Sequence, residues 1–216
     1  MNPSLKLILV LIISLEISFK PNLWANLILI GLALVFLLFN HLKWKEFLVL
    51  LLFPLLGAIS IFSALYFFTP DGDAIYAWTL FTRLYVFVFL GACVTLTTKP
   101  YILVRSLEQN LHLPSKFVYG TLAAFNVVPK MQEEVLRMHY AAQMRGVSLS
   151  FWSPRLYFKA ILASLSWAQG LSSGMAAHGY HENTKRSVLE KIPLTVKDWI
   201  YFVVIILLVQ AIIFMT

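Results

Sequence analysis

The sequence predicts an all-α integral membrane protein, with about five transmembrane helices and long amphipathic cytoplasmic helices. Three observations lead to this fold class. Hydrophobic residues make up 60% of the 216 residues and charged residues only 12%, which is far from the composition of a soluble domain. The apolar residues gather into stretches long enough to cross a bilayer. These stretches are unbroken rather than alternating, which favours helices over a membrane barrel.

The apolar stretches define the expected membrane spans. The first is short, carries Lys6 and Glu16, and ends at the turn signal Lys20-Pro21-Asn22, because proline cannot continue a helix. The position of Glu16 and the lack of a small-residue cleavage site favour a retained helix over a signal peptide. The predicted spans are residues 5–19, 23–39, 47–68, 75–97 and 199–215.

The distribution of basic residues orients these spans. With the N-terminus placed in the cytoplasm, only Lys20 and Arg83 of the 17 lysines and arginines fall outside or in the outer leaflet. The positive-inside rule therefore predicts a cytoplasmic N-terminus and, after an odd number of crossings, an external C-terminus. The predicted organisation is a membrane domain of four helices at 1–98, a cytoplasmic helical region at 99–197 and a final transmembrane helix at 198–216.

The region 99–197 is where we expect the function to reside. Residues 117–128 are predicted to form a short helix ended by Pro129, and an amphipathic helix is expected after it. The apolar stripe of this second helix consists of Met131, Val135, Met138 and Ala142. Arg145 extends the stripe and Gly146 ends the helix. Arg145 is either a snorkelling residue whose stem covers apolar surface or a docking side chain for an acidic or carbonyl-lined groove.

Residues 157–177 are long enough to cross the membrane but contain several polar residues. Two interpretations stay open, a cytoplasmic helix or an extra membrane hairpin formed with residues 117–128. Small residues at helical spacing in both segments predict a close helix crossing. The predicted crossing residues are Ala160, Ser164, Ala168, Gly170 and Gly174 on the longer segment, and Gly120 and Ala124 on the shorter one.

The two amphipathic helices have matching endings. The first ends in Met144-Arg145-Gly146 and the second in Ala177-His178-Gly179. Each ending places a basic type of side chain directly before a helix-stopping glycine. Two such ends could engage two equivalent partner sites.

These features together resemble the transmembrane T component of energy-coupling factor (ECF) transporters, across nearly the whole chain. The resemblance rests on membrane helices followed by long amphipathic helices, on the run Val128-Pro129-Lys130-Met131-Gln132-Glu133-Glu134 and on the paired endings. In that family, two ABC-type ATPase subunits and a T protein energise a small substrate-binding S protein. The resemblance implies those chains and membrane lipid as partners, with no nucleic acid. It also implies that ATP and Mg are bound by the partner ATPases, and that this chain is not an enzyme and holds no cofactor or metal.

The resemblance assigns ATPase docking to Arg145, with Met144 and Gly146, and to His178, with Ala177 and Gly179. Met144 stands where the family has alanine, and His178 where it has a second arginine. Histidine is mostly uncharged near neutrality and cannot make bidentate contacts, so docking at His178 is expected to be weaker.

The implied function is uptake of a micronutrient through a bacterial or archaeal cell membrane. The S protein selects the cargo, so the sequence leaves open a vitamin, a vitamin precursor, or nickel or cobalt. It also leaves open whether the two ATPases are identical.

Two other classes of function fit the sequence less well. A stand-alone small permease or S-type substrate-binding protein needs polar groups at the membrane midplane, but the spans offer only scattered hydroxyls. An intramembrane protease is disfavoured because Glu133, Glu134 and Arg137 are misspaced by one residue. A zinc site at His178, His181 and Glu182 is not expected, since Gly179 breaks the helix between the two histidines.

Overall fold

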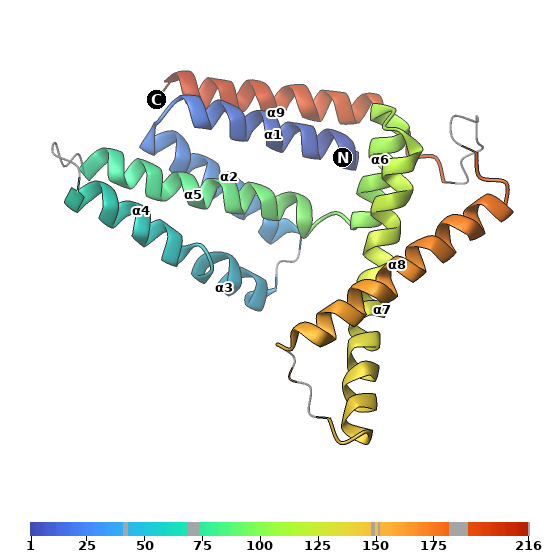
Figure 1. Ribbon diagram of the computed structural model, residues 1–216. Helices are drawn as coiled ribbons and strands as arrows, with labels where there is room; N and C mark the ends of the chain where they lie inside the picture. The colour runs from blue at the N-terminus through green and yellow to red at the C-terminus, as the bar shows by residue number, and fades with distance from the viewer. Residues whose placement is uncertain (41–42, 69–73, 148–149, 151, 182–189, 216) are drawn as a thin grey trace. The chain divides into compact units, whose positions relative to one another are not determined.

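A computed structural model describes residues 1–40, 43–68, 74–147, 150, 152–181 and 190–215 (Figure 1). These ranges are mostly helical and contain no strand, so the predicted all-α class is confirmed. The chain forms two compact units. The first combines Met1–Leu111 with Ile192–Thr216, and the second is His112–Lys191.

The first unit contains the apolar helices. Its described helices are α1 (Pro3–Phe19), α2 (Leu23–Phe39), α3 (Trp44–Leu52), α4 (Leu55–Phe68), α5 (Ala74–Thr95), α6 (Pro100–Leu111) and α9 (Val196–Met215). Helix α6 packs on α1 and so joins this unit, whereas the sequence grouped it with the region 99–197. The placement of these boundaries relative to the membrane stays a prediction.

Asparagine side chains start the first two helices. The Asn2 side chain accepts a hydrogen bond from the Ser4 backbone N–H at 3.2 Å, and the Asn22 side chain accepts one from the Trp24 backbone N–H at 3.0 Å. Each bond satisfies one of the N–H groups that the first turn of a helix leaves unpaired. Pro21 lies between the two helices and prevents α1 from continuing into α2.

Helix α5 is central in the first unit and contacts α1, α2, α3 and α4. Residues that recur every fourth position return to the same side of a helix, and α1 and α2 each bury one such stripe. The stripes are Leu5, Leu9, Ile13 and Ile17 in α1, and Ala25, Leu29, Ala33 and Leu37 in α2. One core cluster joins α1, α2, α5 and α9, and a second joins α2, α4 and α5. Much of the outer surface of these helices is apolar, as expected where lipid is the solvent.

The predicted span 47–68 is divided into two helices. Helix α3 ends at Leu52 and α4 begins at Leu55, because Pro54 has no backbone N–H for a continuous helix. Within the described residues, three segments are long and apolar enough to cross a membrane, namely Trp44–Phe67, Ala74–Thr95 and Val196–Phe214. Helix α2 is apolar but shorter, and α1 falls in neither group. It stays a prediction that all five expected spans cross the membrane. Their orientation also stays a prediction.

A polar network joins the start of α1, the end of α6 and the start of α9; we call it the N-terminal network. The Asn2 side-chain oxygen accepts a hydrogen bond from Asn110 at 3.1 Å, and the Asn2 backbone N–H donates to Asp198 Oδ1 at 3.0 Å. The Gln109 side chain accepts a hydrogen bond from the Ile192 backbone N–H at 2.8 Å. Asn2 is only 5% exposed, and the hydrogen bonds around it are partly buried. The network therefore links segments at opposite ends of the sequence.

The second unit contains two long helices that contact and cross each other, α7 (Ser115–Met144) and α8 (Pro154–Ala177) (Figure 1). Helix α7 continues through Pro129, so the predicted helix end at that residue is wrong. Pro129 removes one backbone donor, but it and Phe125, whose carbonyl loses that donor, are both exposed, and water can replace the lost bond. Neither α7 nor α8 is among the described segments that are long and apolar enough to cross a membrane.

Candidate functional site

Helix α7 ends in a Schellman motif around Arg145. The Val147 backbone N–H donates to the Ala142 carbonyl at 3.0 Å, and the Gly146 N–H donates to the Gln143 carbonyl at 2.9 Å. These are the two hydrogen bonds that define the motif, and they satisfy carbonyls that a helix end otherwise leaves unpaired. Arg145 therefore occupies the position between the last helical residue and the glycine.

Helix α8 ends in the same motif around His178. The Tyr180 backbone N–H donates to the Met175 carbonyl at 2.9 Å, and the Gly179 N–H donates to the Ala176 carbonyl at 3.0 Å. His178 takes the place that Arg145 takes in α7. The two endings thus share a backbone conformation as well as a residue pattern.

The glycines make this shared conformation accessible. Gly146 has φ +73° and Gly179 has φ +77°, in the left-handed region where a side chain is strained. Arg145 has φ −91° and ψ 9°, close to the φ −84° and ψ 14° of His178. The two side chains therefore leave their helices from nearly the same backbone geometry.

Both endings are open to their surroundings. Arg145 and Gly146, and likewise His178 and Gly179, are exposed, and Met144 is 92% exposed. Neither the Arg145 nor the His178 side chain has an ion pair or hydrogen bond within the described part of the chain. An exposed guanidinium can bind a carboxylate with two parallel hydrogen bonds, which an imidazole cannot do.

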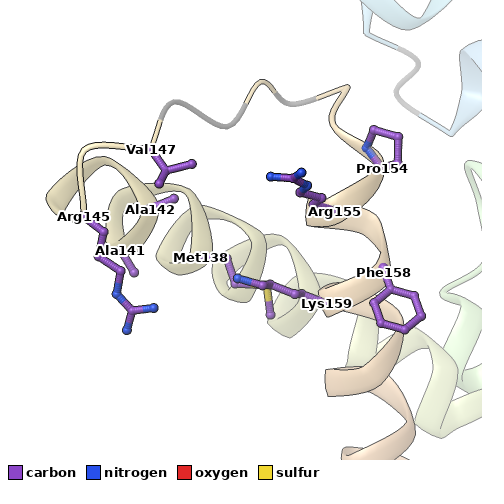
Figure 2. A pocket seen from close by; sticks show the side chains of 9 residues that line it. All are labelled: Met138, Ala141, Ala142, Arg145, Val147, Pro154, Arg155, Phe158 and Lys159. Atoms are coloured by element: carbon purple, nitrogen blue, oxygen red, sulfur yellow. The ribbon is translucent and has the colours of Figure 1, made fainter.

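A cavity of about 590 Å³ lies between the end of α7 and the start of α8 (Figure 2). Arg145 lies at its α7 side, while Arg155 and Lys159 extend from α8 toward α7. Apolar lining comes mainly from Met138, Val147 and Phe158. No motif in the sequence marks Arg155 or Lys159 as a functional residue. Their spacing of four places Arg155 and Lys159 on one helix face, but only the packing of α8 on α7 brings them near Arg145.

Most of the predicted crossing residues do not lie in a tight contact between α7 and α8. Gly120, Ala124, Ala168 and Gly170 are exposed, whereas Ser164 and Gly174 are half-buried and Ala160 is 7% exposed. A Cβ atom added to Gly120, Gly170 or Gly174 would meet no heavy atom within 4 Å. These glycines therefore do not hold α7 and α8 together within this chain, because close helix approach requires a neighbouring backbone at the glycine.

Metal-binding groups do not converge in the described part of the chain. No cluster of three or more histidine, cysteine, aspartate or glutamate side chains occurs there. His178 and His181 lie just past the end of α8, and Glu182 lies outside the described residues. Cys93, the single cysteine, is buried in α5.

The comparison with protein families identifies the class of this chain. The family model described as CbiQ, cobalt transport protein, matches residues 1–188. Together with the apolar helices, this match defines a transmembrane component of a transporter. The chain belongs to the CbiQ family.

Two curated relatives extend over nearly the whole chain. The energy-coupling factor transporter transmembrane protein EcfT of Streptococcus equi subsp. equi (strain 4047) is 23% identical over 239 residues, covering 96% of this chain and 88% of the relative. The protein of the same name from Brevibacillus brevis (strain 47 / JCM 6285 / NBRC 100599) is 25% identical over 240 residues, covering 96% and 89%. The predicted resemblance to the T component of ECF transporters is therefore confirmed.

Proposed function

We propose that this chain is the energy-coupling T subunit of an ECF-type transporter, and that it docks two ABC-type ATPase subunits through the helix ends at Arg145 and His178. The observation that supports this proposal is the pair of Schellman motifs, each of which presents an exposed basic type of residue. Two ends of one backbone geometry suit two partners of one fold.

The mechanism we propose is mechanical. ATP binding closes the two ATPases, and the docked ends of α7 and α8 move with them. Because α7 is a helix of 30 residues, it can carry that displacement over about 45 Å at 1.5 Å per residue. The crossed helices then pass the motion to the membrane helices and to an S component, which reorients its cargo.

The chemistry of transport is assigned to the partner chains in this proposal. ATP and Mg are bound and used by the ATPases, and this chain binds no cofactor of its own. The S component selects the cargo, which we place among vitamins, vitamin precursors, nickel and cobalt. The N-terminus lies in the cytoplasm and the C-terminus outside, so that α7 and α8 lie on the side of the ATPases.

The two helix ends are proposed to be unequal. Arg145 can form a bidentate, permanently charged contact, whereas His178 offers a single ring nitrogen contact. This difference favours an ATPase pair with two non-identical halves.

Co-purification tests the docking proposal. The tagged chain is expressed with the ATPase genes encoded beside it and purified in mild detergent, in wild-type form and as Arg145→Glu and Lys130→Glu. We expect wild type and Lys130→Glu to retain two ATPase subunits, because Lys130 is an exposed cation of α7 away from its end. Arg145→Glu should lose the ATPases while inserting into the membrane normally. Wild type without ATPases, or unchanged retention by Arg145→Glu, would contradict the proposal.

A gain-of-function variant tests the second end. His178→Arg should tighten ATPase binding by on the order of tenfold, since a bidentate guanidinium contact replaces a contact through a single ring nitrogen. The readout is the ATPase concentration needed for half-saturation of the purified chain. No change in that concentration would remove His178 from the docking surface.

A further inference from the structure

The cavity between α7 and α8 collects positive charge without compensation. Arg145, Arg155 and Lys159 all line it, and none of its 9 lining residues is acidic. None of these three side chains forms an ion pair within the described part of the chain. The cavity is thus a concentration of unpaired cations that this chain itself does not neutralise.

The position of Arg155 and Lys159 is unfavourable for helix α8. They stand four residues apart on the same face, where like charges repel each other. Arg155 also lies in the first turn of α8, which contains no acidic residue and where the helix dipole disfavours a cation. Charge repulsion and the helix dipole thus both disfavour these two cations within α8, and an anion bound beside them would relieve both effects.

The rest of the lining defines the shape of what fits. Met138 and Phe158 give the cavity apolar walls, and Phe158 is 63% exposed. Met144, at 92% exposure, directly precedes Arg145, and Trp152, at 88%, lies two residues before Pro154. Exposed aromatic and methionine side chains around a charged centre are typical of protein–protein contact surfaces.

We propose that this cavity is a carboxylate-binding pocket, in which Arg145, Arg155 and Lys159 together receive an acidic side chain of the ATPase that docks at the end of α7. An apolar neighbour of that acidic residue packs on Met138 and Phe158. This inference rests on the proposed function. It extends the docking site at Arg145 by two residues of α8, Arg155 and Lys159. Helix α8 therefore takes part in docking at both of its ends, with this pocket at its start and His178 at its end.

The test measures the affinity of the ATPase for the full-length chain in nanodiscs of phosphatidylcholine. The variant Arg155→Gln/Lys159→Gln is compared with Lys130→Gln/Lys191→Gln, which removes the same charge at exposed positions outside the cavity. We expect the cavity variant to bind at least about tenfold more weakly, as when charged partners are truncated at an interface. The control variant should bind like wild type.

Thermal unfolding separates binding from structure. Because the two cations repel each other and oppose the dipole of α8, the cavity variant should unfold at the same or a higher temperature than wild type. Replacement of Phe158 by a photo-crosslinking phenylalanine analogue provides a second, independent readout, and it should link this chain to the ATPase on illumination.

The outcomes distinguish the two proposals. ATPase binding that is lost in Arg145→Glu but unchanged in the cavity variant, with no crosslink from position 158, overturns the pocket and leaves the docking function standing. Wild type that binds no ATPase overturns both. If the cavity variant differs from wild type only in nanodiscs that contain phosphatidylglycerol, and only in lipid binding, the cavity is a lipid headgroup site and the proposal is wrong.

Discussion

Gly146 and Gly179 are the residues on which the geometry of both helix ends depends. Each has a positive φ and completes a Schellman motif, and neither has a heavy atom within 4 Å of an added Cβ. The requirement for glycine is therefore set by backbone conformation and not by space. The backbone conformation at Arg145 and His178 therefore depends on the glycine that follows each of them.

Substitution of Gly146 tests this dependence. Gly146→Ala should destabilise the end of α7 by about 1 kcal/mol, because a Cβ atom is strained at positive φ, and it should weaken ATPase retention. Gly120→Ala in the same helix is the matched control, since Gly120 is exposed with open space around it, and it should stabilise α7 by about 0.5–1 kcal/mol. Thermal unfolding and co-purification provide the readouts. Equal effects of the two substitutions would show that the left-handed residue does not control the docking end.

At the scale of the element, α7 is a single helix in spite of Pro129. Apolar residues such as Val127, Met131 and Met138 are half-buried on either side of the proline. Their packing stabilises α7 as one continuous helix. Most of the stability of a helix in a protein comes from such packing rather than from local propensity. A long uninterrupted helix is also what force transmission from its end requires.

Removal of the proline tests how α7 is held. Pro129→Ala should stabilise the helix by up to about 3 kcal/mol, because it restores a backbone donor to the Phe125 carbonyl. Hydrogen exchange of the amides in the middle of α7 should slow accordingly. Pro154→Ala is the control, since Pro154 occupies the first turn of α8, where proline costs little, and it should leave exchange unchanged. Faster exchange in Pro129→Ala would show that the proline is needed for the helix.

At the scale of the whole molecule, the N-terminal network ties the last helix to the first. Asp198 Oδ1 accepts a hydrogen bond from the Asn2 backbone N–H at 3.0 Å, and Oδ2 accepts one from the Thr195 backbone N–H at 3.2 Å. The chain leaves the first unit after Leu111 and re-enters it at Ile192. The hydrogen bond between Gln109 and Ile192 joins these two points. The exit and re-entry points of the chain are therefore held together within the first unit.

Disruption of the network should lower global stability. Asp198→Ala is expected to cost about 1–3 kcal/mol, since it leaves the partly buried Asn2 backbone N–H without its acceptor, and the midpoint of thermal unfolding in detergent should fall. Lys197→Ala, at the exposed neighbouring position in α9, should have no such effect. A midpoint that is equally insensitive to both substitutions would mean that α9 is held by its apolar packing alone.

The fold class and the two helix ends could be predicted because their signals are local. A long apolar stretch has one low-energy state in lipid, as a helix, and a glycine after an amphipathic stripe is sufficient to indicate a helix end. The stripe Ala25, Leu29, Ala33 and Leu37 carries a similar signal, the repeat of four that marks one side of a helix. The helix end expected at Pro129 is wrong because the cost of a proline is local and visible in the sequence, whereas the packing that keeps α7 continuous comes from residues along the whole helix.

What the sequence by itself determined is the all-α class, the positions of the apolar stretches and the residue pattern Arg145-Gly146 and His178-Gly179. The division of the stretch 47–68 into α3 and α4, and the packing of α6 on α1, came from the structure. Only the tertiary structure decided that Arg155 and Lys159 of α8 share a cavity with Arg145 of α7, and that Asn2, Asn110 and Asp198 form one network. The physical reason is that helical periodicity fixes which residues share a face of one helix, while the side chains that meet across two helices depend on how those helices pack.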